Sequence, residues 1–164
     1  MIKRTGSSID NPVNTEHYRL QFVDYGSDAY HQAAQLRYQL FYQAHHIPVD
    51  AIFNPAEGTD QHLAITTPDS HRVLAYGRLG QNSSHEFQIY QMVVRPEFQG
   101  QGLGTRILDG LTKSAIRQGA TQLVLFARVT KQAFYQRSGF EPVGNIFPST
   151  MTGVPHIKMQ KHIE

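Results

Sequence analysis

The stretch FQIYQMVVRPEFQGQGLGTRILDGLTKSAIRQ, residues Phe87 to Gln118, decides the fold of this chain. It begins with an apolar, β-branched run from Ile89 to Val94, which is typical of a strand. An Arg-Pro pair ends this run, and glycines follow at positions 100, 102 and 104. Apolar residues then recur at spacings of three and four from Leu103 to Ile116, which predicts an amphipathic helix. The order is therefore strand, glycine-rich turn and helix.

A turn of this kind can bind phosphate groups. Glycine has no Cβ, so backbone N–H groups can approach a ligand closely, and the first turn of a helix adds unpaired donors. Thr105 could add a hydroxyl donor. No Lys-Ser/Thr pair follows the glycines, as a nucleotide-triphosphate loop requires, and the third glycine comes one residue too early for the dinucleotide fingerprint. A turn that binds no ligand is the alternative.

Two segments resemble known motifs of one family. Val94 to Gly104 (VRPEFQGQGLG) resembles the acetyl-coenzyme A signature of the GNAT N-acetyltransferase superfamily, with Gln99, Gly102 and Gly104 at its fixed positions. Ala133 to Phe140 (AFYQRSGF) is similar to the late helix of that superfamily. A weaker similarity points to the ElaA-like branch, whose members usually carry a glutamate near Ala44.

Composition narrows the classes of function. The chain has 164 residues, which fits one domain, and 40% of them are apolar. The net charge is +2 with scattered cations, so no basic stripe indicates nucleic acid. There is no cysteine, which excludes disulfides and thiolate chemistry. No apolar run reaches the ~20 residues of a membrane span, and the polar N-terminus has no signal-peptide core, so a cytoplasmic protein is the default expectation.

The chain divides into a short tail and one domain. Residues 1–16 are rich in Ser, Asn and Thr and predict a flexible tail, and residues 17–164 predict the GNAT-like domain. A helix is expected from Ala29 to about His45, followed by a loop from His46 to Asp60, which the resemblance makes substrate-facing. Strands are expected at His17 to Tyr25, Gln61 to Thr67, Arg72 to Leu79, Gln122 to Ala127, Glu141 to Phe147 and Pro155 to Gln160.

The predicted fold class is α/β (α+β). Three consecutive strands without long helices between them indicate an antiparallel N-terminal part, and the region after the glycine turn indicates a parallel part. With the resemblance, this predicts a mixed central sheet of about six or seven strands, flanked by about four helices.

The resemblance implies where acetyl-coenzyme A binds as co-substrate. The backbone of Met92 to Val94 would pair with the pantetheine arm, on a strand that carries a bulge in relatives. The residues expected to hold the pyrophosphate are Gln99, Gly100, Gln101, Gly102, Leu103, Gly104 and Thr105. A backbone N–H near Met92 or Val93 would bind the thioester oxygen.

The resemblance also suggests catalytic residues. Tyr135 aligns with a tyrosine that in many relatives protonates the leaving thiolate, and a phenol with a pKa of about 10 can do so at neutral pH. A core aromatic residue is the alternative. Many relatives use a strand glutamate as base, but Gln88, Tyr90 and Gln91 stand there. Glu86 and His85, at the start of the strand, are then the nearest candidates, and a water chain is the alternative.

Two further residues could face the acceptor. His156 follows a Gly-Val-Pro turn, and Arg128 follows the strand at Gln122 to Ala127; an ordinary turn histidine and a solvated arginine are the alternatives. No His-x-x-x-His pair or cluster of histidines and carboxylates indicates a metal site, so no metal is expected.

The leading hypothesis is an N-acetyltransferase that moves an acetyl group to a primary amine of a small molecule or peptide by direct attack. A coenzyme A-binding sensor or scaffold without catalysis is a second hypothesis, motivated by the missing strand glutamate. A third is an acyltransferase that uses a longer acyl donor. No nucleic acid or membrane partner is expected, and a homodimer stays open.

Overall fold

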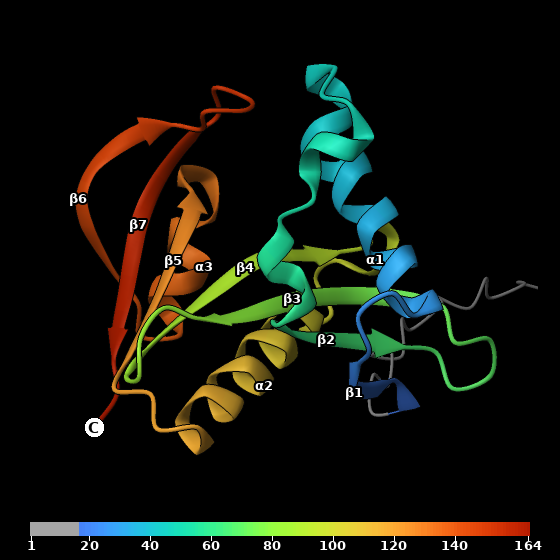
Figure 1. Cartoon of the computed structure of the whole chain (residues 1–164), viewed down its shortest axis with the longest axis horizontal. Coiled ribbons are helices and arrows are strands. Elements are labelled where there is room, and N and C mark those ends of the chain that lie inside the picture. Colours follow the sequence, from blue (N-terminus) through green and yellow to red (C-terminus); the bar gives the residue numbers. More distant parts are fainter. Residues whose placement is uncertain (1–16) are drawn as a thin grey trace, which may run out of the picture.

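The computed structural model describes residues 17–164, so the predicted tail lies outside the described residues. A seven-stranded mixed sheet forms the centre, in the order β1-β2-β3-β4-β5-β7-β6 (Figure 1). The strands are β1 (Arg19–Val23), β2 (Gln61–Thr66), β3 (Val73–Gln81), β4 (Glu86–Val94), β5 (Gln122–Arg128), β6 (Glu141–Pro148) and β7 (Pro155–His162). The expected mixed sheet is confirmed.

β2, β3 and β4 form an antiparallel meander, as their short connections predicted, and β1 pairs antiparallel with β2. Only β4 and β5 run parallel among the described strands, because α2 (Leu103–Arg117) crosses between them. β5, β7 and β6 continue antiparallel. The parallel part is thus one strand pair, smaller than the sequence suggested.

Three α-helices flank the sheet: α1 (Asp28–Arg37), α2 and α3 (Gln132–Arg137). The sequence predicted about four. The long loop that follows α1 holds two short 3-10 turns, η4 (Val49–Ile52) and η5 (Pro55–Gly58), in place of a further helix. Three more such turns are η3 (Gln43–His45), η6 (Pro96–Phe98) and η7 (Val129–Lys131).

The first helix changes its winding before it ends. Ser27 caps α1, because its side-chain oxygen accepts a hydrogen bond from the Tyr30 N–H over 3.2 Å. Beyond Arg37 the chain continues as a π-helical turn, η2 (Tyr38–Tyr42). The predicted helix is helical over this range but not uniformly α. The wider turn brings the neighbours Leu40, Phe41 and Tyr42 to one cavity.

Two helices cover opposite faces of the sheet. The apolar side of α2, with Ile107, Leu108 and Leu111 fully buried, packs on the larger core cluster. α1 packs with Ala33 and Leu36 on a smaller cluster around Tyr76 and Val93. Figure 1 shows α1 and α2 on either side of β3.

Candidate active site

The strand before the glycine turn contains a β-bulge. Tyr76 pairs with Val93 and Arg78 pairs with Tyr90, so Gly77 alone faces two residues of β4. Gln91, in the bulge, has a φ of 55°, which is uncommon for a residue other than glycine. A Cβ on Gly77 would lie 2.7 Å from Cγ2 of Ile107, so glycine lets α2 approach here. A bulge was expected in this strand from the resemblance.

β4 and β5 separate just before the bulge. Their parallel pairing runs from Glu86 with Gln122 to Ile89 with Leu125 and then stops, while β5 stays paired to β7 up to Arg128. Figure 1 shows the C-terminal halves of β4 and β5 diverging. A cavity of about 660 Å³ opens between them, and both strands line it. The β4 edge beyond Ile89 therefore has backbone groups that β5 does not use.

The predicted cofactor residues meet at this cavity. Apart from Gln101, all of them line it: Met92, Val93, Val94, Gln99, Gly100, Gly102, Leu103, Gly104 and Thr105. The side-chain oxygen Oε1 of Gln101 is buried and accepts no hydrogen bond from the described residues. The strand edge and the glycine turn thus form one continuous wall.

The glycine turn presents the start of α2 to the cavity. Gly100 and Gly102 have φ values of +80° and +81°, in the left-handed region that glycine adopts without a steric cost. No side chain caps the helix at Gly102, so its first N–H groups stay available to a ligand. The Gln99 amide donates from Nε2 to the Val94 carbonyl over 3.1 Å and holds the turn against β4. This arrangement suits an anion.

Tyr135 lies at the same cavity, on α3. Its hydroxyl is 3.9 Å from the sulfur of Met92, which follows the bulge residue. Burial raises the pKa of Tyr135 to about 12, so the phenol keeps its proton throughout the neutral range. A group that must give a proton to a departing thiolate fits this position.

His156 and Arg128 face each other across β5 and β7, and both line the cavity. Nδ1 of His156 is 2.7 Å from the Val154 carbonyl, which can only accept a hydrogen bond. In the neutral ring the proton therefore sits on Nδ1 and the lone pair on Nε2. The Arg128 guanidinium lies over the Phe41 ring, 4.6 Å from its centre.

Glu86 is not brought to the site. It lies at the first residue of β4, where its carboxylate accepts a hydrogen bond from Asn82 over 2.9 Å, and it does not line the cavity. Among the described residues that line the cavity, none is an aspartate or a glutamate. Its position gives no support to a role as base.

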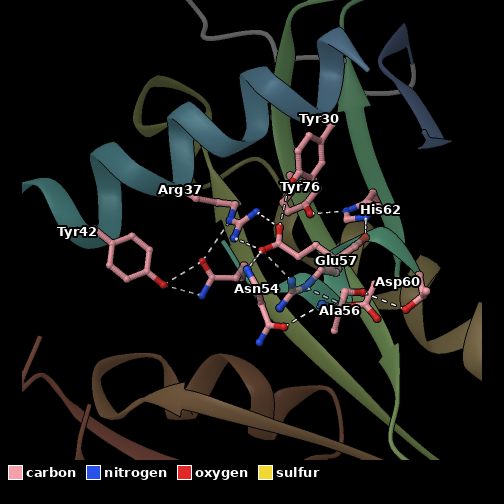
Figure 2. A network of polar contacts seen from close by, with 12 residues as sticks. Tyr30, Arg37, Tyr42, Asn54, Ala56, Glu57, Asp60, His62 and Tyr76 are labelled. Carbon is pink, nitrogen blue, oxygen red and sulfur yellow. Dashed lines mark hydrogen bonds and ion pairs between the residues drawn. The ribbon is translucent and has the colours of Figure 1, made fainter. Parts of the chain in front are cut away.

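A network of buried charged side chains contacts the bulge residue Gln91 (Figure 2). The sequence did not indicate this network. Glu57 of η5 pairs with Arg37 of α1 at 2.8 Å and with Arg78 of β3 at 3.2 Å. Nε of Arg37 donates to Oε1 of Gln91 over 3.2 Å, and Tyr42 also bonds this amide. The network therefore connects α1 and the loop to the bulge.

The position of Glu57 has a local cause. Asn54 and Glu57 form a capping box around η5: the Asn54 side chain accepts from Ala56, and Glu57 accepts from the Asn54 N–H over 2.7 Å. The sequence signal was Asn54-Pro55-Ala56-Glu57, with proline at the first helical position. The loop His46 to Asp60 was expected to face the substrate. Its most buried charge instead faces the sheet.

His62 lies on the far side of the same network. Its Nε2 donates to the Glu57 carbonyl and its Nδ1 accepts from the Tyr76 hydroxyl, both over 2.7 Å. Burial lowers the pKa of His62, so the ring is neutral at neutral pH. Both nitrogens are occupied and the ring does not line the cavity, so His62 has a structural role.

Residues 17–164 lack two kinds of feature. No group of three or more histidine, cysteine, aspartate or glutamate side chains there could hold a metal ion. No helix in that range is long and apolar enough to cross a membrane.

Comparison with known proteins identifies the family. The model of the acetyltransferase (GNAT) domain matches residues 32–163. GCN5-related N-acetyltransferase 2, chloroplastic, from Arabidopsis thaliana is 38% identical over 61 residues, which are 36% of this chain and 24% of that protein. The chain spans less than half the length of the curated relatives it matches.

Solved structures share the fold. Escherichia coli ElaA superposes with a TM-score of 0.72 at 22% identity, over 88% of this chain and 99% of that one. An aminoglycoside 6'-N-acetyltransferase complexed with coenzyme A superposes with a TM-score of 0.65 at 18% identity, over 89% and 97% of the two chains. At identities this low, the superpositions show that the fold is shared, and they do not show that the substrate is shared.

Proposed function

The chain belongs to the GNAT family of acetyltransferases, and from this premise we propose that it moves an acetyl group from acetyl-coenzyme A to a primary amine of a small molecule or peptide. One observation carries the proposal. The unpaired edge of β4 beyond Ile89, the glycine turn and Tyr135 all line one cavity of about 660 Å³. The strand edge fits the pantetheine arm of acetyl-coenzyme A, the anion site fits its diphosphate, and the proton donor lies where the thioester sulfur would leave.

The backbone would hold the donor. The free edge of β4 from Met92 to Val94 would pair with the amide groups of the pantetheine arm as an added strand does. The N–H groups of Gly102 to Thr105 would bind the pyrophosphate at the start of α2. A backbone N–H at Met92 or Val93 would donate to the thioester oxygen, where charge develops during attack.

Side chains would move the protons. His156 would accept the proton of the amine at Nε2, because it is the sole imidazole among the described residues that line the cavity and no carboxylate joins it there. After His156 has passed this proton to solvent, the neutral amine nitrogen bonds to the carbonyl carbon and gives a second proton to Nε2, and the carbon–sulfur bond breaks. Tyr135 would give its hydroxyl proton to the sulfur, and the proton on His156 would restore the phenol through solvent.

The test of the donor site is calorimetric titration with acetyl-coenzyme A, coenzyme A and octanoyl-coenzyme A. We expect micromolar binding and a preference for the acetyl thioester over the octanoyl one. Preference for the longer chain would favour the acyltransferase with a longer donor. No binding of any of the three would overturn the proposal.

The absence of a carboxylate from the described cavity wall favours a second candidate, a coenzyme A-binding sensor without catalysis. Both candidates predict donor binding, so turnover separates them. Release of free thiol from acetyl-coenzyme A that depends on an added amine and on Tyr135 would exclude the sensor. A cytoplasmic location stays a prediction from the sequence.

A further inference from the structure

The charges on the cavity wall are of one sign. Of the ionisable residues that line it, Arg128 and Lys131 carry positive charge, and none of the described lining residues carries negative charge. Enzymes that bind polyamines or aminoglycosides must offset several positive charges, which requires carboxylates near the ligand. This cavity is therefore suited to an acceptor that brings its own negative charge.

Arg128 is a cation without an anionic partner in the described residues. Its guanidinium is half-buried and contacts the Phe41 ring, and none of the ion pairs of residues 17–164 includes it. Burial lowers the pKa of Arg128, but arginine keeps its charge at all physiological pH values. A partly desolvated guanidinium with free N–H groups binds a carboxylate strongly, through two parallel hydrogen bonds.

The place of Arg128 separates it from the donor phosphates. The glycine turn and the start of α2 lie at the end of β4, whereas Arg128 is the last residue of β5, on the other wall of the opening. Its contact with Phe41 puts it beside η2, the turn that follows α1. His156, the residue with a free imidazole nitrogen, is its direct partner in the β5–β7 ladder. Arg128 therefore belongs to the acceptor half of the cavity.

An apolar surface accompanies this cation. Phe126, two residues before Arg128 on the same face of β5, is 49% exposed and lines the cavity. Phe147 packs edge-on against it with ring centres 5.7 Å apart, and is itself 36% exposed. Exposed aromatic rings next to a guanidinium fit a ligand with an apolar group near its anionic one.

We propose that the acceptor is an amine that also carries a carboxylate and an apolar side group, as an apolar amino acid does, with Arg128 binding the carboxylate and His156 facing the amine. The inference rests on the proposed function. It assigns the substrate class of the same site and disfavours polycationic amines.

The test is a matched acceptor series with acetyl-coenzyme A, read as release of free thiol. L-phenylalanine and L-leucine are compared with their amides, with phenethylamine and with spermidine. We expect kcat/KM for each acid to exceed that for its amide by about tenfold to a hundredfold, the range for a hydrogen-bonded ion pair. This comparison uses the unaltered protein, so it does not depend on a variant that folds.

Variants then locate the effect. Arg128→Gln should reduce kcat/KM for the acids to near the level of the amides, mainly through KM, and affect kcat/KM for the amides far less. Arg128→Lys should restore part of the preference. Arg117→Gln removes the same charge from an exposed site in the last turn of α2 and should change neither.

Each other outcome counts against one proposal or both. Equal rates for acids and amides, or spermidine as the best acceptor, would overturn the inference and leave the proposed function standing. Reaction of the amides or of phenethylamine without reaction of any acid would do the same. Failure to bind acetyl-coenzyme A would overturn the proposed function, and the inference with it.

Discussion

The carboxylate of Glu57 lies 2.8 Å from the guanidinium of Arg37, and both side chains are only 1% exposed. Arg78, 5% exposed, approaches the second carboxylate oxygen at 3.2 Å. A buried charge costs much free energy unless its partners remain, so this carboxylate is fixed to its two cations. Since Arg37 also bonds Gln91, the pair joins the loop after α1 to the bulge of β4.

Glu57→Gln should strongly destabilise the fold, because it leaves two guanidinium groups buried without their shared carboxylate. We expect a loss of about 3–5 kcal/mol in the free energy of unfolding, measured by chemical denaturation. Glu97→Gln is the matched control: Glu97 pairs with Arg72 at 3.5 Å, but the two side chains are 60% and 45% exposed. That change should cost about 0–1 kcal/mol. Equal losses of unfolding free energy in the two variants would contradict the view that burial makes the Arg37–Glu57 pair important for stability.

Acid should weaken the protein in part through Glu57. Burial alone would raise its pKa, but the hydrogen bonds from Arg37 and Asn54 and the charges of Arg37 and Arg78 hold the pKa below its ordinary value of 4.5. A carboxyl whose folded pKa is lowered contributes stability above pH 4.5 and loses it as the pH falls through the folded value. The free energy of unfolding of the unaltered protein, measured with urea from pH 6 to about 2.5, should therefore fall more steeply below pH 4.5 than that of the Glu57→Gln variant.

Two other buried groups contribute to this pH profile. Burial raises the pKa of Asp60, which stabilises the fold as the pH falls through its folded pKa, opposite in sign to Glu57. Burial lowers the pKa of His62, so its contribution is lost as the pH falls below 6.5. Glu57→Gln keeps both groups but removes a negative charge that raises the pKa of each, so the difference between the two curves reports Glu57 together with its effect on Asp60 and His62. Parallel curves below pH 4.5 would contradict the assignment.

Gly100→Ala and Gly102→Ala should weaken donor binding. An added Cβ meets no atom within 4 Å at either position, but φ values of +80° and +81° cost an alanine about 1 kcal/mol or more. The turn would relax and move its N–H groups, which calorimetry with coenzyme A would detect as lower affinity. Gly26→Ala is the control, with a φ of +78° and equally open space outside the cavity. It should cost similar stability and leave the affinity unchanged.

Tyr135→Phe should lower turnover about a hundredfold or more and leave acetyl-coenzyme A affinity within about twofold, as loss of a general acid does. The hydroxyl makes one weak contact, to the Met92 sulfur at 3.9 Å, so the fold should tolerate the change. Tyr25→Phe, at a ring that is 57% exposed and outside the cavity, should change neither quantity. A parallel fall in affinity and turnover would point to a packing role for Tyr135.

His156→Gln should slow acetylation of basic amines far more than that of amines that are already neutral. An alkylamine must lose a proton before attack, whereas an arylamine, which is already neutral at pH 7, need not. Thiol release with both acceptors, measured from pH 5.5 to 9, should show the loss with the alkylamine alone. The charged groups that share the cavity are Arg128 on β5 and Lys131 on η7, with the phenols of Tyr42, Tyr90 and Tyr135. Arg117→Gln, which removes an exposed charge of α2 outside the cavity, should leave the rates with both acceptors unchanged.

The sequence predicted the parts of the site that depend on local signals. The run to Val94, the glycines and the stripe from Leu103 each act within a few residues, so strand, turn and α2 follow directly. The position of Tyr135 near Met92 needed the family resemblance, because 43 residues separate them. Most strand ends were correct to within two residues for the same local reason.

The other features of the site depend on contacts between residues that are distant in sequence, and no local sequence pattern indicates such contacts. Glutamine is not a turn residue, so nothing in Gln91 indicates a φ of 55°. Arg37, Glu57 and Arg78 are distant in sequence, and each alone resembles a solvated charge. Glu86 was the carboxylate nearest to the strand positions where relatives carry a glutamate, but it is the first residue of β4 and lies at the opposite end of the strand from the glycine turn.

The short ladder between β4 and β5 has a mechanical consequence. Four residues of each strand, Glu86–Ile89 and Gln122–Leu125, make the one strand pairing that joins the two halves of the described sheet. A donor bound along the free edge of β4 would lie between these halves and contact both. Binding of the donor would then add contacts between the two halves of the sheet, and its release would remove them. The rigidity of the sheet would therefore rise and fall with donor occupancy during each catalytic cycle.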